Sequence, residues 1–168
     1  MELNNILESG YVERFHAVPH ITKQTTGHHS WGVAMIAHWL LPSISKLGLM
    51  YALVHDCAEL ETGDIPFTLK KKSKFVKTLF DKYENDFIKQ NGIDFEPCEL
   101  EKAVVKLADM LEGYNFSYNR VLSGERQAKR MCQQWHNAIV DFEGLNDHTT
   151  HANDIWTKVN KFLTDRTL

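Results

Sequence analysis

Residues 55–64 read His-Asp-Cys-Ala-Glu-Leu-Glu-Thr-Gly-Asp, and Ile65 and Pro66 follow them. The preceding residues, 47–54, are mostly apolar and predict a buried helix. That helix leads into five ionisable groups within ten residues, and buried charge is costly unless it is paired or bound to a metal. On this stretch alone, a solvated acidic helix end and an interior functional site explain the pattern equally well.

The spacing of the charged residues in this stretch predicts that three of their side chains lie on one face of a helix. Glu59 lies four residues after His55 and three after Asp56, so a continuous helix would point all three side chains the same way. Gly63 is expected to end the helix, which lets Asp64 turn back toward that face.

Two residues elsewhere favour the functional site. His29 stands at the start of an amphipathic segment over 28–41 and shares its apolar stripe, so we expect it to face the interior. Asp109 lies beside the apolar stripe of a second segment. Together with the His55–Asp56 pair, these residues make a four-ligand nitrogen and oxygen set that suits a divalent transition metal.

At this point the sequence resembles the HD-domain phosphohydrolases, whose metal ligands follow the order His, His-Asp, Asp, and in particular the small 5'-deoxynucleotidase-like branch. The matching motifs, spread over residues 11–120, are Arg14-Phe15, Gly27-His28-His29-Ser30, His55-Asp56-x-x-Glu59-x-x-Thr62-Gly63-Asp64-Ile65-Pro66 and Lys106-x-x-Asp109. An ordered set of this kind is far more specific than a lone His-Asp dipeptide. The compact chain is most similar to phage-encoded members, some of which are dATP triphosphohydrolases.

The resemblance implies a divalent transition metal, Zn, Co, Mn or Fe, held by His29, His55, Asp56 and Asp109, with room for a second divalent ion. Glu59, on the same face but outside the ligand set, is expected to act as general base or to position the water.

The resemblance also implies a set of substrate contacts. Phosphate contacts are expected from Arg14, Lys70 and Lys106. Asp64 is a candidate for the sugar hydroxyl, because a carboxylate accepts well from an OH. Phe15 is expected to pack against the sugar or the base of the substrate. It occupies a position at which members of this branch commonly have Trp.

The rest of the chain predicts an all-α protein, a compact HD-domain helical bundle with one domain over 1–168. Helices are expected over 1–10, 28–41, 47–54, 75–90, 97–122, 124–140 and 149–163, with a loop over 11–26. Phe75, Leu79, Tyr83 and Phe87 recur at near-helical spacing and predict a stripe that faces the core. The helices within 124–166 are expected to complete the core or to pair subunits of a homo-oligomer.

Composition limits the binding partners and the cellular compartment that we expect for this chain. The chain has 168 residues, 43% of them hydrophobic, and a net charge of −3, so nothing attracts it to a nucleic-acid polymer or a membrane. Its three cysteines form no CxxC pair, which with the absence of a signal-like N-terminus favours a reducing cytoplasm, such as that of a phage-infected bacterium.

Three functions compete at this stage. The first is hydrolysis of a deoxynucleotide, either by a dATP triphosphohydrolase that releases deoxynucleoside and triphosphate, which the phage-like motifs favour, or by a 5'-deoxynucleotidase that releases phosphate from monophosphates. The second is an HD phosphodiesterase of a signalling nucleotide. The third is an inactive binding module, which the intact ligand set and Glu59 disfavour.

Overall fold

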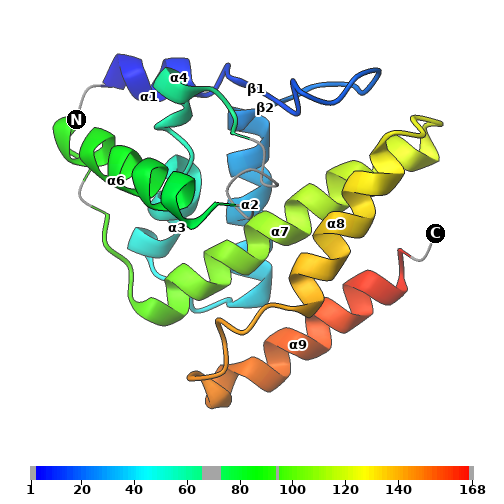
Figure 1. Ribbon diagram of the computed structural model, residues 1–168. Helices are drawn as coiled ribbons and strands as arrows, with labels where there is room; N and C mark the ends of the chain where they lie inside the picture. Colours follow the sequence, from blue (N-terminus) through cyan, green and yellow to red (C-terminus); the bar gives the residue numbers. More distant parts are fainter. Residues whose placement is uncertain (1–2, 66–72, 94, 167–168) are drawn as a thin grey trace.

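A computed structural model describes residues 3–65, 73–93 and 95–166. Its centre is α7 (Glu99–Leu122), which packs against α2 (Thr26–Leu40) and α8 (Ala128–Val140), while α3 (Lys46–Val54) packs against both α2 and α7. Figure 1 shows α7 crossing the molecule, with α3 and α6 on one side and α8 and α9 on the other. The prediction of an all-α fold is confirmed.

Local capping explains where the central helices begin. Thr25 accepts a hydrogen bond from the backbone N–H of His28 at the start of α2, and Ser45 accepts one from Gly48 at the start of α3. Glu101 on α7 accepts from the backbone N–H of Ser45 at 2.6 Å. This bond ties the start of α3 to the central helix, so the chain that reaches His55 starts from a fixed point.

The segment predicted as a loop over 11–26 contains two short paired strands. After α1 (Leu3–Ser9), β1 (Glu13–Arg14) runs antiparallel to β2 (Gln24–Thr25), with Glu13 opposite Thr25. Strands of two residues carry too little alternation to be recognised in a sequence. The pairing places Arg14 directly beside the start of α2.

The predicted continuous helix through His55, Asp56 and Glu59 is also interrupted. The helix α3 ends at Val54, the chain passes through turns, and α4 (Glu59–Thr62) follows. Backbone bonds from Cys57 to Val54 and from Glu59 to Asp56 close these turns at three-residue spacing. Gly63 ends α4 with a positive φ of 68°, a conformation that glycine adopts without strain.

The apolar stripe predicted on α6 (Lys74–Gln90) is wrong as a core face. Only Phe87 is buried, at 3% exposure, whereas Phe75, Leu79 and Tyr83 are 77%, 54% and 43% exposed. The spacing gave the helix correctly. The spacing of apolar residues shows which face of a helix is apolar. It does not show whether another part of the protein covers that face.

The C-terminal helices join the core. The helix α8 begins four residues later than predicted, after a turn in which Gly124 has φ 88°, and α9 (Thr149–Thr164) packs against α2. Ile139, Ile155 and Val159 are buried in the same cluster as Val33 and Leu107. None of the helices in the described part of the chain has the length and apolar content to cross a membrane.

Candidate functional site

Two histidines are held with one ring nitrogen each directed at the same point. His29 on α2 is fully buried, and its Nδ1 lies 2.5 Å from Oε2 of Glu112 on α7. His55 follows α3, and its Nδ1 lies 2.8 Å from the carbonyl oxygen of Ala52. An acceptor at Nδ1 favours a proton on that atom, so Nε2 is the atom of each ring that offers a lone pair when the ring is neutral.

These two Nε2 atoms fit a metal ion. Both are buried and lack a hydrogen bond within the described chain. With a carboxylate oxygen of Asp109 they lie within 4.8 Å of one another, and Oδ1 of Asp109 is 3.2 Å from Nε2 of His29. Oδ2 of Asp56 lies 3.5 Å from His29 and 3.4 Å from His55. Donors that bind Zn²⁺ at about 2.0–2.1 Å in a tetrahedron are themselves about 3.3 Å apart, which matches this spacing.

The electrostatics of the cluster also favour a cation. Burial and the charge of Arg14 lower the pKa of His29, but its contacts with Asp109 and Glu112 outweigh them and raise it to about 9. Burial alone would raise the pKa of Asp109, yet the charges of Lys106 and His29 keep it well below its ordinary value. A site that retains a proton on a buried imidazole between carboxylates can exchange that proton for a metal ion.

Arg14 and Glu59 lie beside the cluster. Arg14, 5% exposed, places NH1 2.5 Å from Oδ2 of Asp56 and 3.8 Å from Oε1 of Glu59. Glu59 accepts a hydrogen bond from the hydroxyl of Thr26 at 3.2 Å. Burial, followed by the charge of Asp56, raises the pKa of Glu59 to about 8. A raised pKa makes the carboxylate form of Glu59 a stronger base toward a water molecule.

Asp64 and Phe15 form the next part of the wall. The backbone N–H of Phe15 donates to Oδ2 of Asp64 at 2.7 Å, and Phe15 has a positive φ of 60°. Its ring stacks on Phe116 of α7 at 5.1 Å between centroids. The strained backbone and the stack together hold the aromatic ring at the mouth of the site.

Of the two predicted lysines, one can be placed. Lys106 donates to Oδ2 of Asp109 at 2.7 Å, and 57% of its side chain is exposed. The charge of Asp109 raises the pKa of Lys106, so it stays protonated. Lys70 lies outside the described residues.

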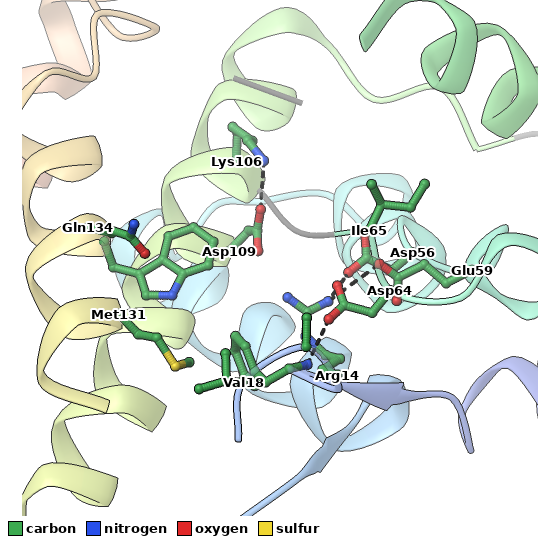
Figure 2. Close-up of a pocket in the computed structure, with 13 residues that line it drawn as sticks. Arg14, Val18, Asp56, Glu59, Asp64, Ile65, Lys106, Asp109, Met131 and Gln134 are labelled. Carbon is green, nitrogen blue, oxygen red and sulfur yellow. Dashed lines mark hydrogen bonds and ion pairs between the residues drawn. The ribbon is translucent and has the colours of Figure 1, made fainter. Parts of the chain in front are cut away.

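These groups line a cavity of about 180 Å³, which Figure 2 shows in close-up. Its charged lining residues are Arg14, Asp56, Glu59, Asp64, Lys106 and Asp109. Met131 and Gln134 of α8 lie across the cavity (Figure 2), and Trp135 of the same helix also lines it. A Cβ on Gly113 of α7 would come within 2.6 Å of the Trp135 ring, so glycine is needed for α8 to approach this closely.

Sequence reasoning missed two groups of site residues. Glu112 holds His29, and Gln24 donates to Oε1 of Glu112 at 2.7 Å. The signal for Glu112 was its place three residues after Asp109, on the same side of a buried helix. Gln24 and the α8 wall carry no comparable signal, because such residues are equally common in ordinary cores and surfaces.

Comparison with known proteins agrees with this geometry. A sequence profile for the family described as 5'-deoxynucleotidase YfbR-like matches residues 4–93. A 5'-deoxynucleotidase from Shewanella oneidensis is 28% identical over 128 residues, a match that spans 61% of this chain and 65% of that protein.

Solved structures share the fold. The cyanophage S-2L HD phosphohydrolase DatZ, bound to dA and one catalytic Zn²⁺ ion, matches with a TM-score of 0.68 and 16% identity over 98% of both chains. The PH0347 protein of Pyrococcus horikoshii matches with a TM-score of 0.70 and 21% identity, over 96% of this chain and 98% of that one.

Proposed function

This chain belongs to the 5'-deoxynucleotidase YfbR-like family, and we propose that it hydrolyses deoxynucleotides with the help of a divalent metal ion. The observation that carries the proposal is the pair of buried, unbonded Nε2 atoms of His29 and His55 beside Asp109. Asp56 completes the ligand set. When bound there, a divalent ion supplies Lewis acidity that polarises the phosphate and lowers the pKa of the attacking water.

Side chains around the metal site have separate roles in the proposed hydrolysis. Glu59 takes the proton of the water that attacks the phosphorus nearest the sugar, the bond from that phosphorus to the 5'-oxygen breaks, and the leaving oxygen takes up the proton that Glu59 received. Arg14 and Lys106 stabilise the charge that develops on the phosphate oxygens. Asp64, fixed by the backbone of Phe15, accepts from a sugar hydroxyl with its remaining lone pairs.

For the substrate, we propose dATP, split into deoxyadenosine and triphosphate. The side chain of Lys106 supports this choice, since it lines the cavity, is largely exposed and offers a positive charge to further phosphates. The near-complete overlap with a phage protein bound to dA agrees with it. The second candidate is a 5'-deoxynucleotidase of monophosphates, which the family description and the Shewanella relative favour.

A product assay tests both candidates. The protein, loaded in turn with Zn²⁺, Mn²⁺ and Co²⁺, is incubated with dATP, dAMP, ATP and AMP, and the phosphates released are separated by chromatography. We expect triphosphate from dATP as the fastest reaction. Faster release of phosphate from dAMP would favour the second candidate, and no hydrolysis of any of them would contradict the proposed function.

Lys106→Ala separates the candidates further. A charge-assisted hydrogen bond is worth about 1.5–3 kcal/mol, so its loss should reduce kcat/KM for dATP by about tenfold or more, and for dAMP by less. Lys102→Ala is the matched control, because Lys102 lies one turn earlier on α7 and pairs with Glu99 away from the cavity. Equal losses on both substrates would remove the argument for a triphosphate.

A further inference from the structure

The cavity has a charged end and an uncharged end. The charged lining residues surround the metal ligands, whereas Phe15, Val18, Met131 and Trp135 make the remaining walls largely apolar. Among the described lining residues, Gln134 contributes the only side-chain amide. It lies on α8, across the cavity from Arg14, Asp56 and Asp64 (Figure 2).

The amide of Gln134 is free to bind a ligand. It is half-buried and makes no hydrogen bond to any residue in the part of the chain that the structure describes. The neighbouring Gln133 differs, because it is exposed and donates to Asn137 along the helix. A half-buried amide loses hydrogen bonds to water unless a partner replaces them.

If deoxynucleotides are the substrates, as proposed above, the phosphate and sugar occupy the charged end. The base must then extend toward the uncharged end, where Met131 and Trp135 present apolar surface to a flat ring. The edge of that ring carries donors and acceptors that need partners. Gln134 lies one turn beyond Met131 on the same helix and also lines the cavity, so its amide is available to that edge.

We propose that Gln134 reads the nucleobase and is a specificity-determining residue of this enzyme. An amide offers an acceptor and donors side by side, which is the complement of the amine and adjacent ring nitrogen of adenine. The Gln134 carbonyl accepts from the 6-amino group, and its NH₂ donates to the ring nitrogen. The metal, phosphate and sugar contacts stay independent of this pair.

The test removes one partner at a time. kcat/KM is measured for dATP and for 2'-deoxynebularine 5'-triphosphate, which lacks the 6-amino group, with the metal-loaded wild type, Gln134→Leu and the control Gln133→Leu. The same pair of monophosphates is used if dAMP is the better substrate. A bidentate amide–base pair corresponds to about 5- to 150-fold in discrimination.

We expect the wild type and Gln133→Leu to prefer the amino-bearing substrate and Gln134→Leu to lose that preference. A Gln134→Leu enzyme with the wild-type preference, or a wild type that does not distinguish the two substrates, would overturn the inference while leaving the proposed function intact. Absence of all hydrolysis by the wild type would instead overturn the proposed function, and this inference with it.

Discussion

The charged end of the cavity, where we propose that the metal binds (the metal end), and the uncharged end, where we propose that the base binds (the base end), are built in opposite ways. At the metal end, each imidazole is fixed by an acceptor at Nδ1, and Arg14 contacts both Asp56 and Glu59. At the base end, one free amide lies among apolar side chains. Buried charges are tolerated only in a fixed arrangement, whereas apolar contact tolerates small displacements. We therefore expect substitutions at the metal end to abolish chemistry and those at the base end to alter affinity.

The largest effect is expected from Asp109→Ala. Its carboxylate lies 3.2 Å from Nε2 of His29, so its loss should remove the metal ion and all measurable hydrolysis. Elemental analysis and turnover measure the two losses. Asp154→Ala is the control, because Asp154 is exposed on α9 and pairs with Lys158 of the same helix. If Asp109→Ala keeps the metal content and turnover of the wild type, Asp109 is not a metal ligand.

Next is Glu59→Gln, which keeps the shape of the side chain and removes its ability to take a proton. Activity should fall by about 10²–10⁴-fold while the metal content stays that of the wild type. Glu61→Gln, two residues later on the exposed side of α4, should behave as wild type. A loss of only a few-fold would make Glu59 a spectator, and loss of metal would place it among the ligands.

A smaller effect is expected from Glu112→Gln. Residues that orient metal-binding histidines typically change metal affinity by about 10–100-fold, and titration with Zn²⁺ measures this. Gly32→Ala should act in the same direction, because a Cβ there would lie 2.8 Å from Cγ of Glu112 and push that side chain away from His29. Glu99→Gln, at the exposed start of α7, is the control. Unchanged affinity in Glu112→Gln would show that His29 does not need this partner.

The smallest effect tests the base end. Val18→Ala removes two methyl groups from the apolar wall, and each buried methylene is worth about 0.8 kcal/mol when fully buried. KM should therefore rise a few-fold, with kcat and metal content unchanged. A large fall in kcat would mean that the two ends are coupled, and it would contradict the expectation that substitutions at the base end alter affinity alone.

The fold class followed from helical periodicity, and the metal ligands were nominated because few residue types bind metals and their order along the chain is distinctive. His29 is buried, as its position on an apolar stripe predicts. His55, Asp56 and Glu59 come together even though turns replace the expected helix between them. These residues are close in the sequence, and this keeps them close in space. The prediction of a continuous helix was wrong, but the three residues still lie near one another.

Only the tertiary structure decided what surrounds the motif. Gln24 and Glu112 meet across 88 positions, and α8 supplies a cavity wall more than a hundred residues after Arg14. The stripe of α6 shows the same limit, since its spacing predicted a core face but Phe75, Leu79 and Tyr83 are exposed. Periodicity records which face of a helix is apolar. Which surface meets that face depends on how the other helices pack, and that information is spread over the whole chain.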